Sequence, residues 1–382
     1  MFYDKKLRLK EGGEIMLGDI VQLKENLWLV KGENPENVLK APTIASSILY
    51  KVEDRLYLID SGVGPVFRQS LKKAIERAYP ISEFYLLNSH LHVDNISNNN
   101  IIKDVQAEKK HHYVSNAGFA SLESYVFDSL ITLSDYYDLF SGYPFPYNMK
   151  LLLYRIRRAF RGKKKAINAF VGMSTKLYKP IHTSRHTMQP LELHPDYEVV
   201  IGEVPWKGWD VQDIKVLEVR GHAPDELIFY IPEHKFLFAA DLTYELIPMW
   251  PSVHRDRSVQ AIENCLAMAG AGEIELLADS HSEEIYNSPD KVVALLEKFL
   301  TDHDRFVDVM REVMEEAGSL TVDEIYKRMK ERRDDPAIGA HFELDFPHSP
   351  FTLRTLICTL MLQLGWPSQG KRGNKSFSLP LE

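Results

Sequence analysis

The chain has 382 residues, which is more than one ordinary core needs, so we expect a large domain and an additional module. With 45% hydrophobic and 26% charged residues the composition is that of a globular protein, and the net charge of −8 argues against nucleic-acid binding by the protein as a whole. Two cysteines, Cys265 and Cys358, imply neither a disulfide framework nor a cysteine-based metal site, and they fit a reducing cytoplasm. The first residues lack the apolar core of a signal peptide, and the longest apolar stretch, 353–366, is too short for a transmembrane segment.

The N-terminal part of the chain predicts strands followed by a helix. Turn-forming residues separate four short β-rich runs, at about 17–24, 27–31, 45–52 and 55–60. The last run enters a tight loop, Asp60-Ser61-Gly62. Apolar residues then recur at helical spacing until Pro80, and a buried strand is predicted at 84–87.

The loop that leaves this strand carries His90, His92 and Asp94. Side chains at i, i+2 and i+4 on such a loop can converge on one point beyond the strand end. Neutral imidazole and carboxylate are ligands that Zn²⁺ and other borderline divalent metals favour. The alternative is a set of polar loop residues with no shared task. His111 and His112 precede the next strand, where adjacent side chains face opposite sides, so we expect them to be structural or surface residues.

Residues 119–195 show a different pattern, which predicts a helical insertion. The insertion contains seven cations in the eleven residues 155–165. This basic stretch is interpreted either as a contact for an acidic partner, nucleic acid or anionic lipid, or as one solvated helix face. An aromatic-rich insertion beside a catalytic loop would also serve as a lid or a substrate wall.

Further strands are predicted at about 197–202, 214–220, 226–231, 235–240 and 273–278, and three of them end at a residue that can bind a metal. A strand at 214–220 runs into His222, and a strand at 235–240 runs into Asp241. After a predicted helix at 256–270, a last strand runs into His281. Side chains on such loops are held by a rigid scaffold, as a metal site requires.

This ordered set of residues resembles the metallo-β-lactamase superfamily over about 15–118 and 196–285, and the Leu-Ile-Asp-Ser-Gly element at Asp60 fits its early strand and loop. The resemblance implies an α/β fold, an αββα sandwich with the site at one edge between two sheets. It implies one or two Zn ions, or Fe or Mn. The implied ligands of the first metal are His90, His92 and His222, those of the second are Asp94 and His281, and Asp241 would bridge the two.

Asp241, where the main β-lactamase branch has Cys, resembles the lactonase, thioesterase and nuclease branches. Tyr244, three residues later, resembles the lactonase tyrosine that contacts the substrate, although a core tyrosine is the alternative. Asp94 and Tyr244 are therefore the predicted catalytic residues. Asp225 is expected to be a supporting carboxylate, and His254 a surface residue.

One residue departs from the family pattern, because Asn95 stands where a further histidine is usual. A carboxamide oxygen is a weaker and harder ligand than imidazole. Three interpretations stay open: two metals with a weakened second position that includes Asn95, one metal, or a non-catalytic relative.

The last eighty or so residues predict a separate module, with a boundary between 1–300 and 301–382. A helix ends at Gly318, a capping box at Thr321–Glu324 opens a second helix, and a third covers 353–364. A basic turn at 371–375 joins two extended pieces. The arrangement resembles the winged-helix-like tail of some superfamily members, which would bind nucleic acid, support a homodimer or wall the cleft.

The sequence thus predicts a cytoplasmic hydrolase that uses a metal-bound hydroxide on an ester, thioester or lactone, with a small-molecule substrate. One alternative is a phosphodiesterase or nuclease, favoured by the basic stretch and the tail. Another is a non-catalytic binding protein, favoured by Asn95 alone.

Overall fold

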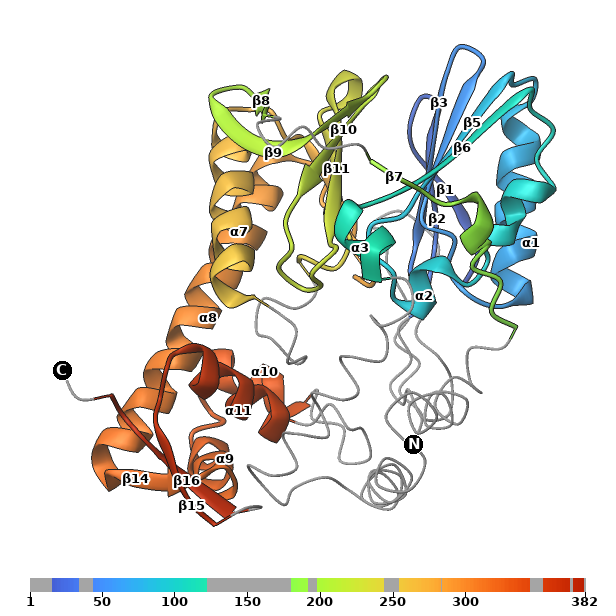
Figure 1. Cartoon of the computed structure of the whole chain (residues 1–382). Helices are drawn as coiled ribbons and strands as arrows, with labels where there is room; N and C mark the ends of the chain where they lie inside the picture. The colour runs from blue at the N-terminus through green and yellow to red at the C-terminus, as the bar shows by residue number, and fades with distance from the viewer. Residues whose placement is uncertain are drawn as a thin grey trace, which may run out of the picture.

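The computed structural model describes residues 16–33, 44–121, 180–191, 198–243, 254–282, 284–343, 353–371 and 374–380. Two large sheets lie face to face, with α1 on the outer side of one and α7 beside the other (Figure 1). The predicted αββα sandwich is therefore confirmed. In the described part of the chain, none of the helices combines the length and apolar character needed to cross a bilayer.

The first sheet is half antiparallel and half parallel. Neighbouring strands pair antiparallel from β1 to β4 and parallel from β4 to β7. The strands, in sheet order, are β1 (Ile20–Lys24), β2 (Leu27–Val30), β3 (Ser47–Val52), β4 (Arg55–Ile59), β5 (Glu83–Leu87), β6 (Lys109–Val114) and β7 (Gln189–Pro190). The strands predicted from the sequence before 90 are confirmed.

The parallel half of this sheet positions a site, because β4, β5 and β6 all end at the same edge. Helix α1 (Pro65–Ala78) connects β4 to β5, and its apolar stripe of Phe67, Leu71 and Ile75 packs on the outer face of the sheet. The short helix α2 (Val93–Ile96) follows β5, and α3 (Asn116–Ser121) follows β6.

The predicted insertion lies largely outside the described residues. Its final part differs from the prediction, since Gln189–Pro190 extends the first sheet as β7 next to β6. The sequence did not indicate this strand, because two residues are too few to show the alternation of apolar and polar side chains that marks a strand. The basic stretch 155–165 lies wholly outside the described residues.

The second sheet has the order β13-β12-β11-β10-β9-β8, antiparallel except for the parallel pair β12 and β13. Its strands are β8 (Glu198–Ile201), β9 (Val204–Val211), β10 (Ile214–Glu218), β11 (Leu227–Ile231), β12 (Phe236–Phe238) and β13 (Leu276–Ala278). Helix α7 (Arg255–Gly270) connects β12 to β13. The sequence did not predict β9, because Pro205 and Gly208 interrupt it. Gly208 is needed there, since a Cβ atom would lie 2.2 Å from the carbonyl oxygen of Val216.

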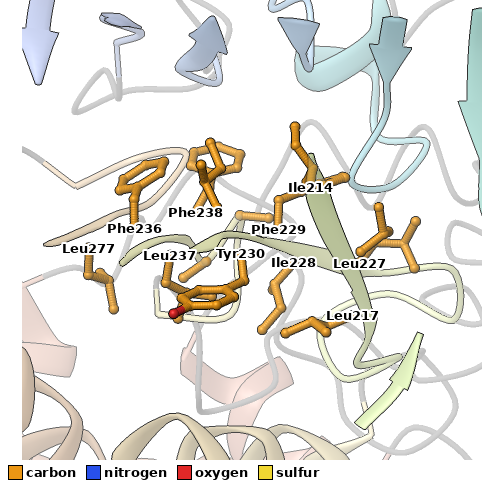
Figure 2. Packing of buried hydrophobic residues seen from close by; sticks show 14 of the residues in the cluster. Ile214, Leu217, Leu227, Ile228, Phe229, Tyr230, Phe236, Leu237, Phe238 and Leu277 are labelled. Carbon is orange, nitrogen blue, oxygen red and sulfur yellow. The ribbon is translucent and has the colours of Figure 1, made fainter. Parts of the chain in front are cut away.

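The main core fills the space between the two sheets and continues under α7. Figure 2 shows the alternation that builds it: Phe229 and Phe238 point to one side of their strands, and Tyr230 and Leu237 point to the other. The two phenylalanine ring centroids are 6.5 Å apart. Tyr230 Oη donates to the carbonyl oxygen of Glu273, just after α7, so that face lies toward the helix layer.

A second core belongs to the C-terminal part of the chain. Its elements are α8 (Pro289–Ala317), α9 (Val322–Glu331), α10 (Pro336–Glu343), α11 (Leu353–Gln363) and a sheet of β14 (Ser319–Thr321), β16 (Asn374–Ser378) and β15 (Ser368–Lys371). The capping box at Thr321 and Glu324, the end of α8 at Gly318 and the β15–β16 pairing are as predicted.

Helix α8 passes through the predicted boundary at residue 300 and contributes to both cores (Figure 1). Val292 and Leu296 belong to the main core, whereas Phe306 and Met310 belong to the C-terminal core. One continuous helix thus connects the two parts. The division into two domains stays a prediction, as does the relationship of the C-terminal part to a winged helix.

Candidate metal centre

Four loops bring polar side chains together at one edge of the sandwich. The loop after β5 carries His90 and His92, the short helix α2 that continues it carries Asp94, and the loop between β10 and β11 carries His222. Asp241 follows β12 and His281 follows β13, which is parallel to β12 and therefore ends at the same edge. The structure places each of these six residues, which the sequence singled out, in one cluster.

Three imidazole nitrogens converge in this cluster. His92 Nδ1 lies 2.8 Å from His90 Nε2 and 3.1 Å from His222 Nε2. Asp241 adds a carboxylate oxygen, Oδ2, at 3.3 Å from His222 Nε2 and 3.7 Å from His90 Nε2. The ligand atoms of these four residues all lie within 4.8 Å of one another.

The donor set fits a divalent cation. Burial lowers the pKa of His90 to about 3, and burial together with the neighbouring histidines places the pKa of His92 well below its ordinary value. Neutral imidazole is the form that binds metals. A single imidazole N–H can donate a hydrogen bond to only one of the neighbouring ring nitrogens. A cation between the rings would instead bind all three nitrogens and the carboxylate oxygen at once.

A second group of candidate ligand atoms adjoins the first. His281 Nε2 lies 3.4 Å from Asp241 Oδ2 and 3.6 Å from Asp94 Oδ2. Burial alone would lower the pKa of His281, but the carboxylates of Asp241 and Asp94 outweigh it and raise the pKa to about 9. Likewise, burial would raise the pKa of Asp241, but the surrounding histidines hold it well below its ordinary value. Asp241 therefore stands between the three-histidine group and the Asp94–His281 pair.

Carboxylates behind the ligands hold the loops in place. Glu226 Oε2 accepts the backbone N–H groups of Gly221 at 3.0 Å and His222 at 2.8 Å. Burial raises the pKa of Glu226 to about 7. Asp225 Oδ2 accepts the N–H of Leu91 at 2.9 Å and so links two ligand loops, in the supporting role expected from the sequence.

Asp279 performs the same function for the other two ligands. Its Oδ1 accepts the N–H of His281 at 2.9 Å, and its Oδ2 accepts the hydroxyl of Thr243 at 2.8 Å. Sequence reasoning missed Asp279 and Glu226. For Asp279 the available signal was an acidic residue directly at the end of an apolar strand, two residues before a predicted ligand, and for Glu226 it was an acidic residue directly before an apolar strand.

Asn95 is fully buried, and its Nδ2 donates to Asp60 Oδ2 at 3.0 Å. Burial raises the pKa of Asp60 to about 7, and hydrogen bonds from Ser89 and Asn95 limit the rise. Within the described residues, Asn95 Oδ1 has no hydrogen-bond partner. The amide nitrogen of Asn95 is thus directed to Asp60.

The other predicted residues lie away from the cluster or outside the described residues. His112 is buried between Asn88 and Thr187, at 2.9 and 2.8 Å, and His111 stacks on Tyr85. Both are structural, as expected. His254 is exposed, and its backbone N–H donates to the carbonyl oxygen of Gly221 at 2.8 Å. Tyr244, the predicted catalytic tyrosine, lies outside the described residues.

Comparisons with known proteins agree with this architecture. A family model described as the metallo-beta-lactamase superfamily matches residues 41–281, well over half of the chain. The chain is similar to a solved metallo-beta-lactamase family protein from Thermus thermophilus, with 13% identity, a TM-score of 0.53, and coverage of 94% of this chain and 100% of that one. It is also similar to a solved beta-lactamase domain protein from Burkholderia ambifaria, with 12% identity, a TM-score of 0.55, and coverage of 95% of this chain and 94% of that one. At these identities the similarity concerns the fold alone. No curated protein matches the chain.

Proposed function

Since this chain belongs to the metallo-beta-lactamase superfamily, we propose that it is a metal-dependent hydrolase acting on an ester, thioester or lactone. The observation that carries the proposal is the convergence of three imidazoles and one carboxylate on a single point. The three buried carboxylates that hold these loops favour an intact metal site over a decayed one.

His90, His92, His222 and Asp241 would hold the metal, and an imidazole-rich set favours Zn²⁺ over harder cations. When bound there, a divalent metal lowers the pKa of water from 15.7 toward about 7 and polarises a carbonyl or phosphoryl oxygen. Mn and Fe remain alternatives, since imidazole and carboxylate bind both.

Asp94 is the residue proposed to move protons. Its side chain is partly accessible, 13% exposed, whereas that of Asp241 is 4% exposed. A carboxylate at the edge of the site can orient an attacking water, accept its proton and return the proton to the leaving group. His281, at 3.6 Å from Asp94, would hold that carboxylate in place.

The lactone, ester or thioester class is favoured by sequence features. Asp241 and Tyr244 occur in the order that resembles the lactonase branch, where the tyrosine contacts the substrate. A phosphodiesterase is the second candidate, because the basic stretch 155–165 would attract a phosphate-bearing substrate. Cytoplasmic location, a homodimer and a winged-helix role for the C-terminal part stay predictions from the sequence.

The test combines metal analysis with a substrate panel. Metal content is measured by mass spectrometry, and hydrolysis of lactones, aryl esters, acyl thioesters and an aryl phosphodiester is measured with and without chelator. His222→Ala should abolish tight metal binding and hydrolysis, whereas His111→Ala should change neither, because His111 stacks on Tyr85 outside the cluster. Chelator-sensitive cleavage of the phosphodiester alone would favour the second candidate, and the absence of both bound metal and activity would refute both.

A further inference from the structure

A buried hydrogen-bond chain joins the end of β4 to the loop that carries His90. Asp60, Ser89 and Asn95 are all fully buried. Asp60 Oδ1 accepts the backbone N–H of Ser89 at 2.9 Å, and Asp60 Oδ2 accepts the hydroxyl of Ser89 at 2.6 Å. The Asn95 amide donates to the same Oδ2 at 3.0 Å. The carboxyl group of Asp60 thus receives three donors from this loop.

The protons of this chain can be assigned by counting donors. Ser89 has one hydroxyl proton. Above pH 7, where Asp60 is ionised and can only accept, the contact of 2.6 Å places this proton toward Asp60. Ser89 Oγ also lies 3.0 Å from His90 Nδ1. Because the hydroxyl proton is already used, this second bond requires Nδ1–H to donate and Ser89 Oγ to accept. His90 is therefore protonated at Nδ1, and its Nε2 carries a lone pair.

That tautomer is the one needed at the candidate metal centre. His90 Nε2 is the atom that faces His92 Nδ1, at 2.8 Å, and Asp241 Oδ2, at 3.7 Å. A ring nitrogen binds a metal only through its lone pair, and the partner of the other nitrogen determines where that lone pair is.

Asn95 belongs to the same chain. Its backbone carbonyl oxygen accepts the N–H groups of Ser61 at 2.7 Å and Gly62 at 3.1 Å, so the residue is attached to the loop after β4 by main chain and side chain. The amide must present its nitrogen to Asp60, because an oxygen would face a carboxylate. In this position Asn95 orients Asp60, and Asp60 in turn orients Ser89.

We propose that Asp60 and Ser89 are positioning residues that hold His90 in the tautomer required for metal binding through Nε2, with Asn95 as the donor that fixes Asp60. The inference rests on the proposed metal-dependent function. It assigns a task to Asn95, the residue that departs from the family pattern.

Two measurements test this proposal. In the metal-free protein, at a pH above the pKa of Asp60, long-range ¹H–¹⁵N correlation spectra identify which nitrogen of His90 is protonated, with the His90 signals assigned by their loss in His90→Gln. Zn²⁺ affinity is measured by competition with a chromogenic chelator in wild type, Ser89→Ala, Ser89→Thr and Ser61→Ala. Ser61 is a matched control, because it is equally buried and its hydroxyl bonds to Asn99 Oδ1 at 2.7 Å and to the backbone oxygen of Asn95 at 3.1 Å, not to Asp60, Ser89 or His90.

We expect the wild-type proton on Nδ1 and a Zn²⁺ affinity that falls about 10–100-fold in Ser89→Ala. Ser61→Ala should bind as the wild type does, and Ser89→Thr, which keeps the hydroxyl, should bind more tightly than Ser89→Ala. A wild-type proton on Nε2 overturns the inference even if Ser89→Ala does not fold. Equal affinities of Ser89→Ala and Ser61→Ala overturn it while leaving the proposed function intact. A wild type that binds neither Zn²⁺, Mn²⁺ nor Fe²⁺ refutes the proposed function and, with it, the role of the chain in metal binding.

Discussion

The carboxylate of Asp241 lies 3.4 Å from His281 Nε2, although β13 and the whole of α7 separate the two residues from one another along the chain. The contact joins the Asp94–His281 pair to the three-histidine group, since the same oxygen lies 3.3 Å from His222 Nε2. Neutralising this carboxylate therefore affects both groups.

Asp241→Asn is expected to lower metal affinity at least about 100-fold, because a neutral amide replaces the charged oxygen shared by three histidines. Metal content after dialysis against a weak chelator measures the effect. Asp256→Asn is the control, since the Asp256 side chain is 89% exposed. Full metal retention in Asp241→Asn would show that Asp241 is not a ligand.

Glu226→Gln tests the carboxylate behind His222. The amide oxygen can still accept both backbone N–H groups, but it lacks the negative charge that strengthens these bonds to a carboxylate. We expect unfolding free energy to fall by about 1–3 kcal/mol and metal affinity to fall about 10-fold. Urea denaturation and chelator competition measure the two effects, and Glu263→Gln, at an exposed position of α7, provides the baseline. Stability and affinity equal to that baseline would contradict the assigned role.

Tyr57→Phe tests a contact that joins the two sheets far from the metal centre. Tyr57 Oη donates to Asp213 Oδ2 at 2.7 Å, and Arg55 pairs with the same carboxylate at 3.0 Å. Asp213 directly precedes β10, and it is the far end of that strand that leads to His222. The substitution should cost about 0.5–1.5 kcal/mol of stability and leave metal affinity unchanged. A change in metal affinity without a loss of stability would contradict the expectation that this contact stabilises the fold independently of the metal centre.

The pH dependence of stability should report the contact between α7 and α8. His303 is 1% exposed, and its Nε2 accepts the Nε–H of Arg255 at 2.7 Å. Burial, with a further contribution from the Arg255 cation, lowers the pKa of His303 to about 4. Between pH 6.5 and about 4 the unfolded chain therefore binds a proton that the folded chain does not, so stability falls as the pH falls.

For this one group the loss is up to about 1.4 kcal/mol per pH unit. Urea denaturation at pH 7, 6 and 5 measures it in wild type and in His303→Gln, which lacks the titrating group. We expect a shallower pH dependence in the variant. Identical slopes would show that His303 does not titrate with the folding transition.

The local patterns were sufficient for much of the fold. Alternating and helical periodicities gave the strands before residue 90, α1, α7 and the capping box of α9, because each is determined by neighbours within a few residues. They failed for β9, where Pro205 and Gly208 weaken the strand pattern and only pairing with β8 and β10 stabilises it. They also failed for α10, which is short and packs against α8 and α9.

By itself the sequence predicted the candidate ligands and their order, because each of them follows an apolar strand and strand ends are recognisable from composition. Only the tertiary structure decided which atoms meet: His90 and His222 present Nε2, and His92 presents Nδ1. It also decided that Asn95 donates to Asp60, and that Glu226 and Asp279 lie behind the ligands. The physical reason is that a hydrogen bond depends on distance and direction in space, and residues such as Asp60 and Ser89 come within bonding distance only when two parallel strands lie side by side.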